Sequence, residues 1–248
     1  MTKLATNVLL VDEGNTFVKW AIFNANMEMI SGTEKSITAR FLNKLKKENP
    51  SLDTLFISSV RKEGLSKVVK YADWKLLELN AKTKLPFKNL YRSPNSLGAD
   101  RKALVSAACS FYPKNPVLII GAGTCITYDI KDSQNHYYGG AISPGLQMRL
   151  DAMSHFTSKL PSLSARKELS TAGTDTHSAM FKGALEGLLH EVNGFIDAYR
   201  KEYGSSLKVM LAGGDALRLE SNLKRKIFVE PQLVLYGLLS LYELNQKK

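Results

Sequence analysis

The stretch from Leu9 to Phe23 constrains the fold more than any other part of the chain. It reads LLVDEGNTFVKWAIF, with two apolar segments separated by a short polar one. Unbroken apolar segments suit strands that are buried on both faces. Glycine and asparagine tolerate positive φ, so the segment from Asp12 to Thr16 predicts a tight turn and the whole stretch predicts a β-hairpin.

The tip of this hairpin carries groups that suit a nucleotide phosphate. Gly14 has no Cβ to keep an anion from the backbone N–H groups, Asn15 and Thr16 add short donors, and Lys19 supplies a point charge. Asp12 would hold a magnesium ion through water, as this hard cation prefers. The same residues also fit an ordinary hairpin turn with a solvated lysine, because a motif match alone is only a hypothesis.

The predicted elements that follow alternate in a characteristic order. They are a strand, a helix, a buried strand, a helix and a strand, at 27–31, 37–47, 54–58, 65–71 and 74–79. Three antiparallel strands followed by α/β alternation match half of a ribonuclease-H-like fold. A connection over 81–96 then leads to a helix over 102–111, where the small residues Ala103 and Ala107 allow close approach to a neighbour.

The second half of the chain repeats this order. It predicts strands at 116–120, 125–130, 137–143 and 208–212, and helices at 146–156, 176–200 and 231–244. A second hairpin tip appears at 121–124, and Gly213-Gly214 follows a buried strand. Each of these glycine segments also fits a plain turn or a tightly packed helix entry. We therefore predict an α/β protein of two ribonuclease-H-like lobes, 1–115 and 116–248, with the active site in the cleft between them.

Composition limits the other function classes. The 248 residues carry a formal net charge of +11, but the basic residues are scattered, which is more typical of a solvated surface that attracts anionic substrates than of a nucleic-acid binder. Two cysteines cannot form a disulfide framework, and we see no leader or spanning segment, so we expect a cytoplasmic protein.

Asp100 is the candidate general base. It lies at the start of a predicted helix, where a carboxylate is stabilised by the helix N-terminus, so an ordinary N-cap is the alternative interpretation. Arg101 beside it would neutralise that carboxylate or bind a substrate carboxylate. None of the four histidines has a partner at ligand or triad spacing.

Taken in order, the motifs resemble type III pantothenate kinase, within the acetate and sugar kinase/Hsc70/actin superfamily. They are Asp12-x-Gly14-Asn15-Thr16-x-x-Lys19, Tyr91-x-x-Pro94, Gly98-x-Asp100-Arg101, Gly123-Thr124-Cys125-x-Thr127, Gly139-Gly140-x-Ile142-x-Pro144-Gly145, Thr176 and Gly213-Gly214.

This resemblance implies ATP-dependent phosphorylation of pantothenate, the first step of coenzyme A synthesis, by a homodimer that uses Mg²⁺ and a monovalent cation, K⁺ or NH₄⁺. It implies that Asp100 is the proton acceptor. The residues implied to bind ATP are Asp12, Glu13, Gly14, Asn15, Thr16, Phe17, Val18, Lys19 and Thr124, and those implied to bind pantothenate are Tyr91, Gly98, Ala99, Asp100, Arg101 and Thr176.

Gly121 departs from the family pattern, which typically has an aspartate there as a ligand of the monovalent cation. We therefore expect a weakened cation site. Two alternatives to the kinase stay open: an accessory transcriptional regulator of the same fold, which a basic chain would suit, and another kinase of the superfamily. A regulator without catalysis would not need the whole set of Asp12, Lys19, Asp100 and Thr124, and the chain has all four. The Gly98-x-Asp100-Arg101 motif disfavours another kinase of the superfamily.

Overall fold

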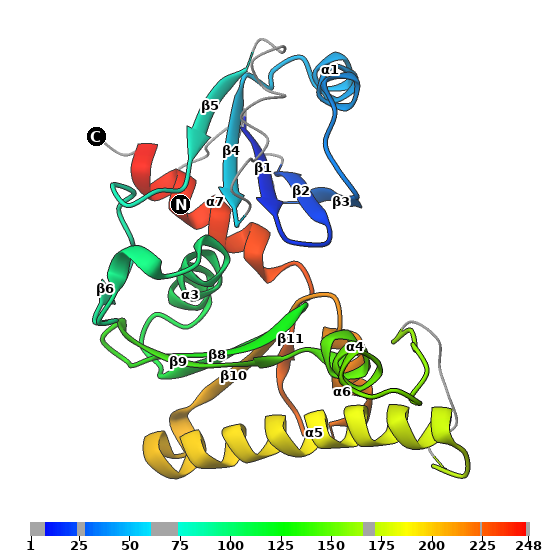
Figure 1. Ribbon diagram of the computed structural model, residues 1–248. Helices are drawn as coiled ribbons and strands as arrows, with labels where there is room; N and C mark the ends of the chain where they lie inside the picture. The colour runs from blue at the N-terminus through cyan, green and yellow to red at the C-terminus, as the bar shows by residue number, and fades with distance from the viewer. Residues whose placement is uncertain (1–7, 24–27, 61–73, 166–171, 224, 247–248) are drawn as a thin grey trace. The chain divides into compact units, whose positions relative to one another are not determined.

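The computed structural model describes residues 8–23, 28–60, 74–165, 172–223 and 225–246 (Figure 1). The chain forms two compact units. The first comprises Met1–Phe111 with Gln232–Lys248, and the second comprises Tyr112–Pro231. No helix in the described part of the chain is long and apolar enough to cross a membrane.

The first unit contains a sheet of order β3-β2-β1-β4-β5, in which β1 pairs antiparallel with β2 and parallel with β4. All six residues of β1 are buried, which explains the unbroken apolar run from Val8 to Val11. The strands are β1 (Val8–Glu13), β2 (Val18–Phe23), β3 (Met29–Glu34), β4 (Thr54–Ser59) and β5 (Lys75–Glu78).

In the described part of this unit, three α-helices pack against the sheet or against one another. Helix α1 (Ala39–Glu48) begins after Thr38, whose hydroxyl accepts a bond from the N–H of Phe41, and it buries Leu42 and Leu45 against the sheet. Helices α3 (Ala99–Phe111) and α7 (Leu233–Gln246) pack against each other and against β4. They approach so closely that a Cβ on Gly237 would lie 1.8 Å from the carbonyl oxygen of Ala103, so the predicted close approach of this helix is confirmed.

The second unit repeats the same topology, with strands in the order β11-β10-β7-β8-β9. β7 pairs antiparallel with β8 and parallel with β10, as β1 does with β2 and β4. The strands are β7 (Val117–Ala122), β8 (Cys125–Lys131), β9 (His136–Pro144), β10 (Lys208–Ala212) and β11 (Phe228–Val229). The predicted duplication of a ribonuclease-H-like fold is confirmed.

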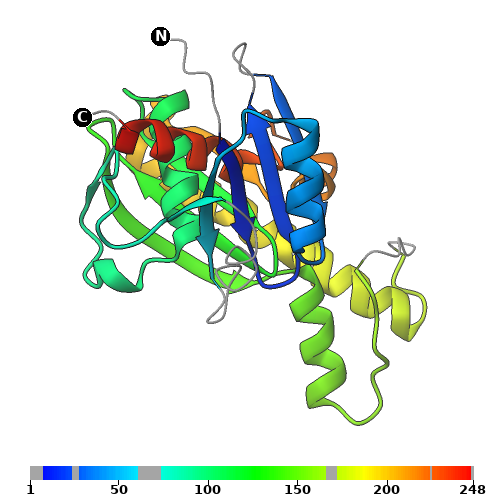
Figure 2. The same ribbon diagram turned by 90° about the horizontal axis from the view of Figure 1, so that it is seen from above.

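The long helix α5 (Thr176–Tyr203) covers one face of this second sheet (Figure 1). Its buried side chains Leu188, Val192 and Ile196 belong to the same core cluster as Leu118 and Ile120 of β7. A capping box of Asp175 and Ser178 starts the helix. Helix α4 (Leu146–Phe156) lies beside α5 (Figure 2), and α6 (Ala216–Asn222) follows β10.

The structure differs from the sequence prediction at several boundaries. The third strand begins later than the expected 27–31, and α3 begins at Ala99 rather than at Lys102. The helix predicted over 65–71 lies outside the described residues. The C-terminal helix, which we placed in a lobe of 116–248, packs in the first unit, because its nearly all-round apolar surface is buried against α3, β1 and β4.

Candidate functional site

The first hairpin closes at a short tip. The N–H of Gly14 donates to the carbonyl of Phe17 at 3.1 Å, and a Cβ on Gly14 would lie at 3.1 Å from that same oxygen. Strand β1 runs to Glu13 and so includes Asp12 and Glu13, which were expected in the turn; Asp12 lies directly across from Lys19. The predicted carboxylate and ammonium therefore sit on neighbouring strands at one end of the sheet.

Asp12 is a buried carboxylate with an unsatisfied oxygen. Only 8% of the residue is exposed, and its Oδ1 has no hydrogen-bond partner among the described residues. Burial and the nearby charge of Asp100 raise the pKa of Asp12 to about 6, against the lowering effects of Lys19 and of the Ser58 hydroxyl. The predicted metal-binding carboxylate and the predicted base are thus close enough to interact within one unit.

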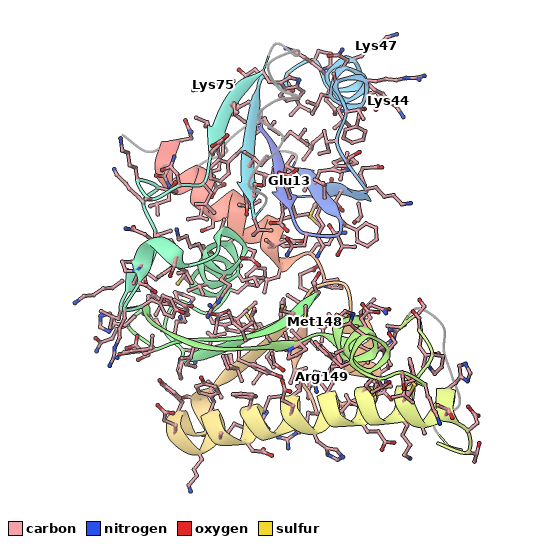
Figure 3. All side chains as sticks on the ribbon, viewed as in Figure 1. Glu13, Lys44, Lys47, Lys75, Met148 and Arg149 are labelled. Atoms are coloured by element: carbon pink, nitrogen blue, oxygen red, sulfur yellow. The ribbon has the colours of Figure 1, made fainter. Side chains whose placement is uncertain are left out.

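Glu13, predicted to bind ATP, forms hydrogen bonds with residues at the end of the neighbouring strand. Its carboxylate accepts a hydrogen bond of 2.7 Å from the Ser59 hydroxyl, and its backbone carbonyl accepts one from the N–H of Val60. Both partners lie at the end of β4 (Glu13 is labelled in Figure 3). The side chain therefore ties the hairpin to the neighbouring strand.

Asp100 occupies the first turn of α3. The helix begins at Ala99, so Asp100 is its second residue and the alternative of an N-cap does not hold. The carboxylate lies over Gly98, where a Cβ would meet its Oδ1 at 2.5 Å. The buried guanidinium of Arg101 lies 5.7 Å from the ring centroid of Tyr91. The structure thus brings together the predicted pantothenate-binding residues of the first unit.

The second hairpin has an uncharged tip built of backbone groups. The N–H of Gly123 donates to the carbonyl of Cys125, and the carbonyl of Thr124 accepts a 3.0 Å bond from the N–H of Gly145. A Cβ on Gly145 would lie 2.2 Å from the carbonyl oxygen of Gly123, so only glycine allows this approach. Thr124 itself is exposed.

A third backbone segment meets the same hairpin. Gly213 has a φ of 100°, and a Cβ there would lie 2.1 Å from the carbonyl oxygen of Ala122. That oxygen also accepts a bond from the N–H of Asp215. Gly213 is therefore required both by its backbone conformation and by space, whereas a Cβ on Gly214 would meet nothing within 4 Å.

Gly121 lies opposite Thr127 on β8 and Ala212 on β10. The hydroxyl oxygen of Thr127 is buried and has no hydrogen-bond partner among the described residues. The last predicted site residue, Thr176, is the exposed first residue of α5 and follows the capping Asp175. Thr124 and Thr176 belong to the second unit, and the other predicted residues belong to the first.

Sequence reasoning missed Ser58, which faces Asp12 across β1 and β4. A polar residue ending the apolar run of β4 was the available signal. It also missed Arg149 and Glu191, which form an ion pair between α4 and α5 (Arg149 is labelled in Figure 3). Nothing in the spacing of these two residues points to their contact, because they are 42 positions apart.

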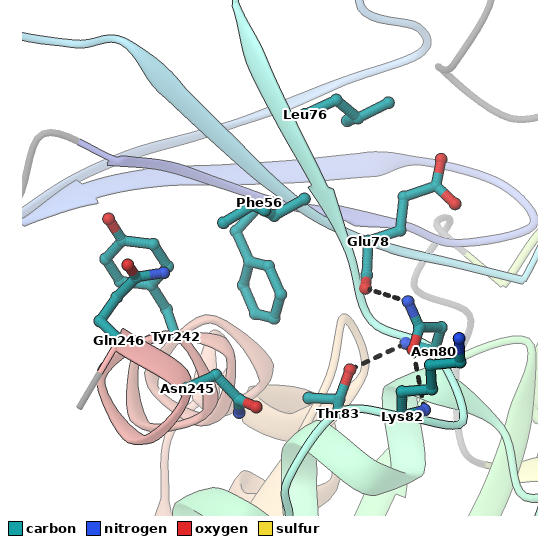
Figure 4. Close-up of a pocket in the computed structure, with 10 residues that line it drawn as sticks. Phe56, Leu76, Glu78, Asn80, Lys82, Thr83, Tyr242, Asn245 and Gln246 are labelled. Carbon is teal, nitrogen blue, oxygen red and sulfur yellow. Dashed lines mark hydrogen bonds between the residues drawn. The ribbon is translucent and has the colours of Figure 1, made fainter. Parts of the chain in front are cut away.

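The first unit also contains a pocket of about 360 Å³ that none of the predicted site residues lines (Figure 4). Phe56 and Tyr242 form its aromatic wall, with ring centroids 6.0 Å apart. Hydrogen bonds of Asn80 to Thr83 and to the carbonyl of Glu78 shape the turn on its other side. These polar groups already satisfy one another within the turn.

Comparison with known proteins gives a consistent family. Residues 8–198 match the family model of type III pantothenate kinase. Type III pantothenate kinase of Christiangramia forsetii is 39% identical, covering 96% of this chain and 98% of the relative, and that of Phocaeicola vulgatus is 37% identical, covering 96% and 99%.

Solved structures agree on the fold. A structure from Campylobacter jejuni, assigned to the Baf family of transcriptional activators, matches with a TM-score of 0.61 and 20% identity, covering 97% of this chain and all of the other. The ADPNP-bound activator of 2-hydroxyisocaproyl-CoA dehydratase from Clostridium difficile matches with a TM-score of 0.52 and 16% identity, covering 96% and 94%. On its sequence, its duplicated fold and its relatives, the chain belongs to the type III pantothenate kinase family.

Proposed function

We propose that this protein transfers the γ-phosphoryl group of ATP to the primary hydroxyl of pantothenate, giving 4′-phosphopantothenate for coenzyme A synthesis. The observation that carries the proposal is the pairing of Asp12 and Asp100 in one unit, with a buried, unpartnered oxygen on Asp12. Phosphoryl transfer needs positioning and charge stabilisation more than covalent help from the protein, and these residues supply both.

Asp100 acts as the general base in this proposal. It accepts the proton of the pantothenate hydroxyl as that oxygen attacks phosphorus. Its carboxylate lies in the first turn of α3, near the N-terminal end of that helix. Arg101 and Tyr91, which lie together beside it, orient the pantothenate molecule, and the guanidinium suits its carboxylate.

Asp12 suits a Mg²⁺ ion that accompanies ATP. Its free Oδ1 can accept a metal-bound water, and a cation there would offset the repulsion between Asp12 and Asp100. Such an ion neutralises developing charge on the phosphates when it is bound. Lys19, across the hairpin from Asp12, adds a second positive charge that suits the phosphates.

The residues around Gly121 do not fit a monovalent cation in the manner of the family. Glycine offers no carboxylate, and its cross-strand neighbour Thr127 offers a single hydroxyl. We therefore assign no step of the reaction to K⁺ or NH₄⁺.

We also propose that the enzyme works as a homodimer. A Cβ added to Gly183, Gly187 or Gly194 of α5 would meet no atom within 4 Å, so this helix offers small residues to a second backbone. Thr176 at the start of the same helix is exposed and would reach pantothenate in the partner subunit. Light scattering tests this: a fully active monomer at the assay concentration would rule the dimer out.

We infer a cytoplasmic location because two cysteines in 248 residues cannot form the disulfide framework common in secreted proteins.

The test of the proposed function is a coupled ADP-release assay with pantothenate and, in parallel, a panel of sugars, glycerol and acetate. With ATP present, we expect turnover of pantothenate and of none of the other acceptors. Turnover of a sugar but not of pantothenate would reject this substrate and favour another kinase of the superfamily.

The second candidate function is an accessory transcriptional regulator. It draws on the fold shared with the Campylobacter jejuni structure and on the net charge of +11. DNA binding by the purified protein at physiological salt, without kinase activity, would favour it over the kinase.

A further inference from the structure

A cluster of four polar side chains in the second unit connects helix α5 to the rest of that unit. Glu191 of α5 accepts hydrogen bonds from three elements. They come from the Tyr128 hydroxyl on β8 at 2.8 Å, from the Ser143 hydroxyl on β9 at 2.9 Å, and from the Arg149 guanidinium on α4. Both partners of the ion pair are largely buried, with 22% of the Arg149 side chain and 24% of the Glu191 side chain exposed.

The bonds of this cluster favour the ionised form of Glu191. Burial raises the pKa of the carboxyl, but the bonds from Arg149, Tyr128 and Ser143 outweigh it, so the pKa lies below its ordinary value. Burial and the bond to Glu191 raise the pKa of Tyr128. At neutral pH the cluster therefore consists of a carboxylate, a guanidinium and neutral hydroxyl groups, a charge-assisted arrangement that is stronger than neutral hydrogen bonds.

Arg149 extends this cluster to the second hairpin tip. Its Nε donates to the carbonyl of Pro144 at 2.9 Å, while another nitrogen of the same planar group donates to Ser143 and Glu191. The next residue, Gly145, donates its N–H to the carbonyl of Thr124. A single guanidinium thus clamps the Pro144-Gly145 segment, and that segment holds the Gly123-Thr124 tip.

We propose that Arg149, held by Glu191, is a positioning residue for the nucleotide. It fixes the Gly123-Thr124 backbone in the conformation that accepts an ATP phosphate, and it does so through Pro144-Gly145 without touching the nucleotide. This inference rests on the proposed function in one respect, the contact of Thr124 with ATP. The gain is preorganisation, because a tip already in its binding conformation loses less freedom when the ligand arrives.

Arg149→Lys is the first test. Lysine keeps the positive charge beside Glu191, but one ammonium cannot reproduce the planar fork that reaches Pro144 and Glu191 together. We expect the dissociation constant for ADP with Mg²⁺, measured by calorimetry, and the KM for ATP to rise by roughly tenfold. We expect the KM for pantothenate to stay within about twofold, since a positioning role acts on the nucleotide alone.

Glu191→Gln is the second variant, in case lysine at 149 prevents folding. It keeps an oxygen acceptor of the same size and removes the charge that holds the guanidinium. We expect a smaller change in the same direction, roughly threefold in nucleotide affinity.

Asp197→Asn is the matched control. Asp197 lies on the same helix and forms a bidentate ion pair with Arg225, with bonds of 2.6 and 2.8 Å, but Arg225 makes no bond to the hairpin tip in any described contact. We expect unchanged nucleotide affinity. If Arg149→Lys and Glu191→Gln lowered only the melting temperature, or altered only the KM for pantothenate, the proposal would be overturned. Calorimetry with ADP needs no turnover, so it stays informative even if the parent protein does not phosphorylate pantothenate.

Discussion

The two hairpins of this protein have the same topology and opposite chemistry. Counting along the paired strands, Asp12 on β1 corresponds to Gly121 on β7. The neighbour of Asp12 on the parallel strand is Ser58, and that of Gly121 is Ala212. The first tip thus gathers charged and polar side chains, whereas the second is shaped by glycines and backbone carbonyls.

The two repeated hairpins therefore differ in what they contribute: one carries charged side chains and the other a fixed backbone conformation. A buried carboxylate with a raised pKa is costly for stability, and the chain keeps it in the unit that also holds Asp100. The second tip avoids that cost, since Gly145 and Gly213 hold it by close backbone contacts. The tip of the first hairpin is therefore defined by charged side chains, and that of the second by the conformation of its backbone.

The largest effect is expected from Asp100→Asn, which removes the proposed base from the charged unit. We expect kcat to fall by about 10² to 10⁴, the usual span for losing a general base, with ADP affinity retained. Steady-state kinetics and calorimetry check this. Turnover at the parental rate would show that the charge of the first unit serves another purpose.

Gly213→Ala tests the shape of the second tip. The added Cβ would collide with the carbonyl of Ala122 in a backbone conformation that alanine rarely adopts, so we expect a loss of roughly 2 to 4 kcal/mol in the free energy of unfolding. Gly214→Ala is the matched control and should change it by less than about 1 kcal/mol. Equal effects in urea denaturation would mean that the tip is not held by this close contact.

Asp12→Asn tests the stability cost of the charged tip. Because the pKa of Asp12 is raised to about 6, the folded state binds a proton more tightly than the unfolded state between pH 3.8 and about 6. The parent protein should therefore lose stability as pH rises through this window. Without Mg²⁺ and nucleotide, Asp12→Asn should be more stable at pH 8 by about 1 to 3 kcal/mol and no more stable at pH 4.

Urea denaturation at the two pH values measures this difference, with the exposed Asp151→Asn of the second unit as the control. The same substitution at Asp12 should also weaken turnover. If Asp12→Asn were less stable than the parent at pH 8, the ionised Asp12 carboxylate would not lower the free energy of unfolding as we expect.

The smallest effect concerns Gly121→Asp, which gives the second tip the carboxylate of the first. The assay starts in a buffer free of alkali metals, and potassium, ammonium or sodium is then added. We expect the rate of the parent protein to rise only weakly with each cation. A carboxylate beside Thr127 would strengthen the potassium response of pantothenate phosphorylation by roughly three- to tenfold. Gly121→Asn, equal in size and uncharged, should not. Strong parental dependence on low-millimolar potassium would contradict this prediction.

The local pattern of the sequence was sufficient for much of this fold. Buried apolar runs identified β1, β4 and β7, and glycine with asparagine or threonine located both hairpin tips. The neighbourhood of Asp12 and Asp100 could not be derived in this way, since it depends on how α3 packs beside the sheet. The motif order suggested that both belong to one site, but the raised pKa of Asp12 follows from burial, which has no local signal.

Long-range packing accounts for the remaining differences. The sequence predicted the C-terminal helix but placed it in the second lobe, because a surface that is apolar nearly all round does not show which elements will bury it. The contact of Arg149 with Glu191 likewise depends on the geometry between α4 and α5. Such contacts follow from the assembled unit rather than from a pattern along the chain.

The return of α7 to the first unit has a consequence for the order of events during synthesis. The second unit is continuous in sequence, so all of its strands and helices have been made once residue 231 is added. The first unit starts earlier but lacks the helix that covers α3 and β1 until residues 233–246 follow. The unit that the ribosome begins first is therefore the last to be completed, and its apolar surface on α3 stays uncovered while the second unit folds.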